Sequence, residues 1–244
     1  MNRVTKITSF VLCFAPLAIV VVDFSNIYAF LAAGTTVIAT TALFDLLVLR
    51  YGQKKSASGY FSALASVFFL LGLFGGLLAV SALAVKLAMA FAAGVLLYLY
   101  KSQKFAASAA LDEAVLLSAA ALLFATLWGI NFYFARPWYI LLALIALVFF
   151  PFLWQAFYAT KARTRALELA LFTTLIIAET AWPLLFFPTH FLTTALIQLS
   201  IFYLIFHFSK LYFTGRLTRS TIYFQAGLAI VVMVLGLLSS PWSY

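Results

Sequence analysis

The residues best placed to do chemistry in this chain lie in two neighbouring apolar segments. Glu179 stands near the middle of the segment 168–188, far from either end. An ionisable group at that depth of a membrane costs about 2.5–3.5 kcal/mol on insertion scales, so it must be neutral, paired or solvated by an internal cavity. Glu168 precedes it by three helical turns on the same face. Glu179 is therefore the first candidate for a protonatable group.

The segment 191–209 carries a matching set of polar side chains. At helical spacing they form one broad stripe, which consists of Thr193, Ser200, Tyr203, His207 and Lys210. A polar stripe is costly to expose to lipid, so we expect it to face the preceding segment. His207 could relay protons, or it could simply form hydrogen bonds near the inner membrane surface.

The short turn between these two segments fixes their register. If the turn ends at 188 and 191, residues at equal depth have numbers that sum to roughly 379. This register predicts a Glu168–Lys210 ion pair. It also predicts a neutral Glu179 that is hydrogen-bonded to Ser200 or Tyr203.

Asp45 is a further candidate, near the inner end of an earlier apolar segment. Its place beside the membrane surface, with Arg50 close by in the sequence, offers one explanation; a role in lining a pathway is the alternative.

The chain has a single cysteine, Cys13, so no disulfide can form within it and no site with several thiolates is available. We expect no metal site and no cofactor.

The composition places these residues in a membrane. Hydrophobic residues make up 66% of the chain and charged residues only 9%, whereas ordinary soluble domains are about half apolar and a quarter charged. Backbone polar groups in lipid must be satisfied internally, which leaves helices or a closed barrel. Long apolar runs without alternating polarity favour helices. The sequence therefore predicts an all-α, polytopic transmembrane bundle with no soluble domain, in which residues 1–244 form one domain.

Apolar segments long enough to cross the hydrocarbon recur along the whole chain. We expect about nine spans, at 7–22, 27–49, 60–82, 84–100, 108–131, 137–157, 168–188, 191–209 and 221–239. Arg3 and Lys6 before the first segment are also typical of a signal peptide, and cleavage there would leave eight spans.

The basic residues support nine spans and set their orientation. With the N-terminus inside, every lysine and arginine except Lys86 and Arg136 falls on the cytoplasmic side. This distribution follows the positive-inside rule and predicts that the C-terminus lies outside. It also explains the net charge of +9 without nucleic acid, because the basic residues form short clusters between spans.

Small residues indicate where helices could approach closely, since apolar burial alone does not drive association in lipid. Gly72 and Gly76 form a GxxxG pattern in the third segment, and Ala90 and Gly94 have the same spacing in the fourth. We expect these four residues to form a close hairpin contact. Gly34, Thr41 and Asp45 share one face of the second segment, which should look into the bundle.

Three functions remain open at this point. The first is a small-solute or proton-coupled transporter or channel with Glu179 as its protonatable group. The second is a structural or assembly subunit of a membrane complex, whose partners are other membrane subunits or further copies of the chain. The third, an intramembrane enzyme acting on a lipid or a lipid-linked substrate, is the least favoured, because no phosphate-cradling GxxxxGK[ST], HExxH or GxSxG motif is present. Short loops suit a prokaryotic plasma membrane.

Overall fold

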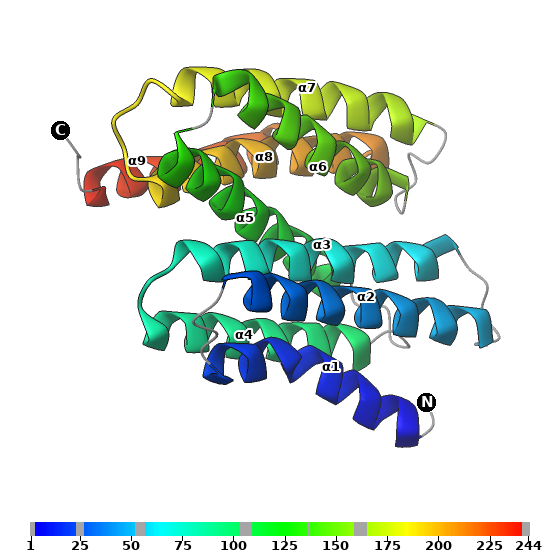
Figure 1. The fold of residues 1–244 in the computed structure, drawn as a ribbon. Helices are drawn as coiled ribbons and strands as arrows, with labels where there is room; N and C mark the ends of the chain where they lie inside the picture. The colour runs from blue at the N-terminus through cyan, green and yellow to red at the C-terminus, as the bar shows by residue number, and fades with distance from the viewer. Residues whose placement is uncertain are drawn as a thin grey trace. The chain divides into compact units, whose positions relative to one another are not determined.

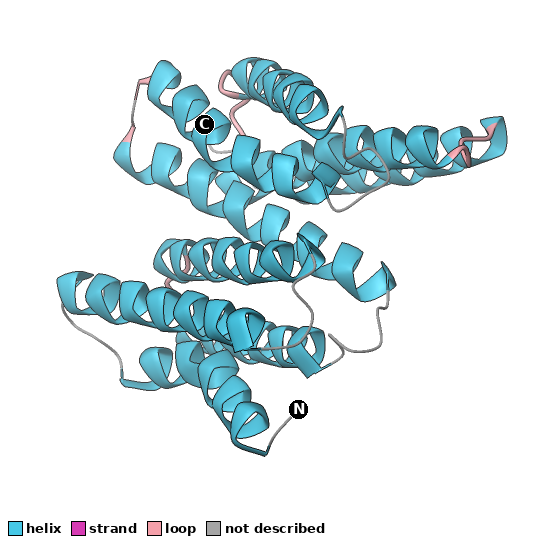
Figure 2. Cartoon of the chain, turned by 90° about the vertical axis from the view of Figure 1, so that its right-hand side faces the viewer, coloured by secondary structure: helices cyan, strands magenta, loops and turns pink. Residues whose placement is uncertain are grey.

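The computed structural model describes residues 3–22, 27–51, 57–102, 109–135, 137–158 and 165–240, and all regular structure among them is helical (Figure 2). In chain order the described helices are α1 (Arg3–Val22), α2 (Ile27–Tyr51), α3 (Ala57–Ala79), α4 (Leu83–Ser102), α5 (Ala109–Phe134), α6 (Trp138–Tyr158), α7 (Ala166–Leu184), α8 (Phe191–Thr214) and α9 (Arg219–Ser239). Each corresponds to one predicted span.

The multi-pass helical architecture predicted from the sequence is confirmed. Seven of the described helices are long and apolar enough to cross a membrane, and α1 and α3 contain the shorter apolar stretches Ile7–Val21 and Leu64–Leu78. The protein is thus an integral membrane protein whose helices suit a lipid bilayer. The identity of that membrane and the inward N-terminus remain predictions.

The C-terminal ends of α7 and α8 differ from the expected bounds by several residues. α7 stops at Leu184 rather than 188, and its last turn tightens: the backbone N–H of Phe186 donates to the carbonyl of Pro183 at 3.2 Å. α8 extends to Thr214 because Gly215 ends it in a left-handed conformation, with φ of 68°. The N–H of Arg216 then reaches the carbonyl of Leu211, as in a Schellman motif.

The chain divides into two compact units, Met1–Leu123 and Phe124–Tyr244, and α5 contributes to both. We call them unit 1 and unit 2 and describe each by itself. Whether the whole of 1–244 acts as one domain remains a prediction.

Unit 1 contains α1–α4 and the first part of α5 (Figure 1). Its helices make close contacts at glycines. A Cβ atom added to Gly72 of α3 would lie 2.9 Å from the backbone nitrogen of Leu123 in α5. One added to Gly94 of α4 would lie 3.0 Å from the carbonyl oxygen of Cys13 in α1. Gly34 of α2 lies against the ring of Phe74 in α3, which brings the predicted face of α2 into the bundle.

The expected α3–α4 hairpin contact is therefore wrong in its partners. Gly72 approaches α5, and Gly94 approaches α1, with which α4 packs most extensively. Gly76 does face α4, because a Cβ atom added to it would lie 3.3 Å from the end of the Met89 side chain. Ala90 of α4 is fully buried. Spacing identifies the small faces of a helix, but a bundle offers each face several possible neighbours.

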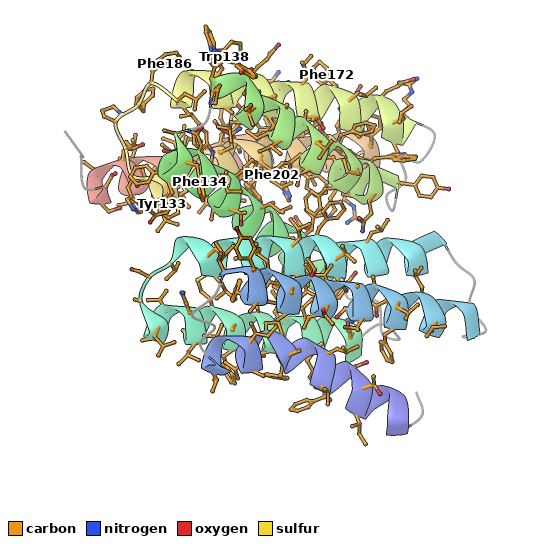
Figure 3. All side chains as sticks on the ribbon, viewed as in Figure 1. Tyr133, Phe134, Trp138, Phe172, Phe186 and Phe202 are labelled. Atoms are coloured by element: carbon orange, nitrogen blue, oxygen red, sulfur yellow. The ribbon has the colours of Figure 1, made fainter. Side chains whose placement is uncertain are left out.

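Unit 2 contains α6–α9 and the second half of α5, around an aromatic core. Phe202 of α8 is fully buried and lies with its ring centroid 6.0 Å from that of Phe124 in α5 and 5.8 Å from that of Phe149 in α6. The rings of Phe124 and Phe149 stack at 4.2 Å. Figure 3 shows Phe202 among the helices, whereas Phe172 and Phe186 point away from them.

Exposed aromatic residues gather at one end of unit 2, which we call the aromatic end. They lie next to the α5–α6 and α7–α8 turns, on both sides of each turn or within it. They are Tyr133, Phe134, Trp138, Tyr139, Trp182, Phe186 and Phe187. Such residues are enriched where a membrane meets water. The backbone N–H of His190, in the α7–α8 turn, donates to Ser240 at 3.4 Å and so ties the end of α9 to this end.

The topology can be tested with reporter fusions after Arg165 and after Ser240. Three helices separate these positions, so the two reporters should lie on opposite sides of the membrane, with the Arg165 fusion inside. Reporters on the same side would contradict the nine-span topology.

The glycine contact in unit 1 can be tested by substitution. Gly72→Leu should lower the free energy of unfolding by about 1–3 kcal/mol, because the new side chain meets the backbone of α5. Gly227→Leu in α9 is the matched control, since nothing lies within 4 Å of the position of its Cβ. Thermal unfolding in detergent measures both, and equal effects would contradict the close contact.

Candidate functional site

Glu179 lies on the surface of unit 2, on the exposed face of α7. It stands five residues before the end of the helix at Leu184, and three residues before Trp182 of the aromatic end. At 1.5 Å per residue, Glu179 is only about 4.5 Å deeper than Trp182. Its depth is therefore shallower than the middle of a span, because α7 ends earlier than the sequence suggested.

The predicted hydrogen bond from Glu179 to Ser200 or Tyr203 is wrong. The hydroxyl of Ser200 donates to the carbonyl of Leu196 in its own helix at 2.9 Å, and the Tyr203 hydroxyl donates to the side-chain amide oxygen of Gln225 in α9. Tyr203 also stacks on His207, with ring centroids 5.2 Å apart. This part of the stripe on α8 thus faces α9 rather than α7.

The α7–α8 contact is instead made by Gln198, which sequence reasoning missed. Its amide nitrogen donates to the carbonyl of Ile177 at 2.7 Å and to the hydroxyl of Thr180 at 3.0 Å. Gln198 is fully buried, and interhelical hydrogen bonds of this kind stabilise membrane helix pairs by about 0.6 kcal/mol. An uncharged amide inside an apolar run is the signal that could have identified it.

The predicted register is nevertheless close to the observed one. Gln198 and Thr180 have numbers that sum to 378, next to the expected sum of about 379. Glu179 precedes Thr180, and one residue of an α-helix turns the side chain by about 100°. The depth was thus predicted correctly, and the rotation of the helices was not.

The predicted Glu168–Lys210 ion pair is also wrong. Glu168 is exposed at the start of α7, and among the described residues it forms no ion pair. Lys210 is half-buried near the end of α8.

Among the described residues, an ion pair joins Asp45 of α2 to Lys101 of α4, within unit 1. The Lys101 Nζ lies 3.1 Å from the Asp45 Oδ1, and both side chains are 3% exposed. The same ammonium lies 5.9 Å from the ring centroid of Phe44. The sequence places Asp45 near the inner membrane surface, on a face of α2 that looks into the bundle, with Arg50 close by; the side chain of Arg50 lies outside the described part of the structure. The structure adds a cation at the end of another helix, Lys101, as a partner of Asp45.

This arrangement holds α2 and α4 together electrostatically rather than assembling a reactive centre. No group of three or more His, Cys, Asp or Glu side chains that could hold a metal ion occurs within the described ranges. Asp45 is buried in unit 1, Glu113 is half-buried near the start of α5, and Glu168 and Glu179 are exposed on unit 2.

A double-mutant cycle tests the buried pair. Lys101→Met should lower the free energy of unfolding by about 3–5 kcal/mol, because it takes away the cation that contacts the Asp45 carboxylate. Adding Asp45→Leu should restore most of that loss, since an apolar pair of similar volume is often as stable as a buried ion pair. Losses that simply add, measured by thermal unfolding, would show that the two side chains do not interact.

Comparisons with known proteins bear on most of the chain. Residues 59–239, from α3 to the end of α9, match a family described as a protein of unknown function (DUF5656). No curated protein and no solved structure matches the chain. The chain is therefore a multi-pass membrane protein that belongs to the DUF5656 family.

Proposed function

We propose that the protein is a structural subunit of a membrane assembly and that it binds its partner through the outward face of α7. The observation that carries this proposal is the exposure of Glu179 on that face. Glu179 lies one helical turn below Trp182, so its carboxyl group costs less to expose to lipid than one at the centre of a span, but the exposure is still unfavourable. A polar group from a neighbouring helix would remove that cost.

The two faces of α7 are built differently. The inner face, which packs on α6, carries small buried residues such as Ala166, Ala170, Thr173 and Ala181. The outer face carries large side chains and both acids, at alternating spacings of four and three residues. We call these residues the α7 seam: Glu168, Phe172, Leu175, Glu179 and Trp182.

A four–three spacing keeps one face of a helix against a second helix over its whole length. Leu175 is 57% exposed and Trp182 is 52% exposed, so the α7 seam presents a continuous surface to its surroundings. The side chain of Phe172 points outward from the same face (Figure 3). The seam therefore has the form of a surface that packs against another transmembrane helix.

The charges of the α7 seam indicate the chemistry of the partner. A second copy packed in parallel would place acid against acid, which is unfavourable. A transmembrane helix with two cationic side chains eleven residues apart would instead meet both Glu168 and Glu179. We therefore assign the seam to a partner helix of that kind.

The transport hypothesis is supported less well by this geometry. It requires water to reach Glu179 from an internal cavity. Glu179 faces outward, and the cavity described in unit 2 is lined by other residues. No described feature favours an intramembrane enzyme.

Proton flux into liposomes distinguishes transport from assembly. Transport predicts a proton flux that Glu179→Gln abolishes.

A designed helix tests the assembly proposal directly. A polyleucine transmembrane peptide with two lysines eleven residues apart, reconstituted with the protein, should bind the α7 seam. Glu179→Leu should weaken binding about tenfold, which corresponds to about 1.4 kcal/mol. A cysteine on the peptide should form a disulfide with Leu175→Cys, in a Cys13→Ala background.

Two controls make this experiment specific. The peptide without lysines should bind weakly, and Leu228→Cys, on the exposed face of α9, should not cross-link. Equal binding of both peptides would refute the charge argument. A dominant cross-link between two copies of the protein at Leu175→Cys would refute the partner assigned here.

A further inference from the structure

A small cavity lies at the aromatic end of unit 2, between the end of α5 and the α7–α8 turn. Its volume is about 90 Å³ and it is partly open. Trp128, Asn131 and Phe132 line it from α5, and Thr189 and Thr194 line it from the turn and the start of α8. All of these residues belong to unit 2, so the cavity is formed within one compact body.

Two polar groups that line this cavity have unmet hydrogen-bonding capacity. The indole nitrogen of Trp128 and the side-chain oxygen of Asn131 are buried, and neither has a hydrogen-bond partner among the described residues. Trp128 is only 4% exposed. Buried polar groups are rarely left unbonded, because each then loses the free energy of its hydrogen bond to water. Trp128 thus offers a hydrogen-bond donor, and Asn131 offers an amide about one helical turn further along α5.

The opposite wall adds two hydroxyl groups. Thr189 and Thr194 are buried, and their side-chain oxygens lie 2.9 Å apart in a mutual hydrogen bond. Thr194 also donates to the backbone carbonyl of His190 at 3.4 Å, so the two hydroxyl protons are used and the pair retains lone pairs that can accept a further hydrogen bond. The cavity thus combines the Trp128 donor and the Asn131 amide on one wall with hydroxyl acceptors on the other.

The remaining lining residues are apolar, three phenylalanines and two leucines, and none of the lining residues carries a formal charge. Phe132 and Phe191 face each other there, with ring centroids 5.7 Å apart. Binding sites of this composition use apolar rings for contact area and a few polar groups for orientation. A neutral hydroxyl group fits best, because it both donates and accepts and needs no counter-charge.

We propose that this cavity binds the edge of a neutral hydroxyl-bearing group, such as a sugar ring or a glycerol unit. The aromatic end places the cavity at the level of a membrane surface. The group can therefore come from a glycolipid headgroup or from a free sugar, and both sources present the same chemistry. This inference is independent of the α7 seam.

Binding can be measured in nanodiscs of phosphatidylcholine with and without monoglucosyldiacylglycerol. The glucolipid should change the intrinsic tryptophan fluorescence, and Trp128→Phe should abolish the change. Asn131→Leu should weaken binding about tenfold, or about 1.4 kcal/mol. Thr194→Val, which keeps the shape of the side chain, should also weaken binding. Free methyl β-glucoside identifies the source: competition indicates a soluble sugar, and no competition indicates the lipid headgroup.

Matched controls separate binding from folding. Trp154→Phe alters an exposed tryptophan of α6, and Thr35→Val removes a hydroxyl that bonds only within α2; neither should change binding. If neither the glucolipid nor methyl β-glucoside changes the tryptophan fluorescence of the native protein, the proposal is overturned, and water is then the occupant of the cavity. Full binding by Asn131→Leu and Thr194→Val together would also overturn it.

Discussion

Leucine gains no free energy by leaving lipid for the interior of a helix bundle, and the packing of this protein follows from that constraint. Its helices meet where backbones can come close or where polar groups bond. Gly72 and Gly94 supply the close approaches in unit 1, and the Asp45–Lys101 pair supplies a buried charge contact there. In unit 2, the small buried residues of α7 allow the close approach, and Gln198 supplies the buried polar contact.

The same constraint explains why the helices themselves could be predicted from the sequence. Their lengths are set by the thickness of the hydrocarbon, and their ends by short charged or turn-forming segments. Each predicted span therefore corresponds to one observed helix. The depth of residues across the α7–α8 turn could also be predicted, because a short turn leaves little freedom along the helix axis. The contact between Gln198 and Thr180 reflects that register.

Rotation and choice of neighbour could not be predicted in the same way. When both faces of a helix are apolar, hydrophobicity does not distinguish the face that is buried from the face that meets lipid. Glu179 was therefore assigned to the inner face of α7, although it lies on the outer one. The contact between Asp45 and Lys101 could not be predicted from the sequence either, because the two residues are 56 positions apart in the chain. Such pairings depend on the arrangement of several helices at once.

The position of α8 has a consequence for how the chain is made. α8 bonds to α7 through Gln198 and to α9 through Tyr203, and its Phe202 fills the core beside α5 and α6. Helices enter the membrane in the order of synthesis, so α5, α6 and α7 are inserted before the helix that unites them. During synthesis, α5, α6 and α7 are therefore in the membrane before their contacts with α8 can form. Until α8 is inserted, the helix faces that Phe202 and Gln198 contact lack those partners.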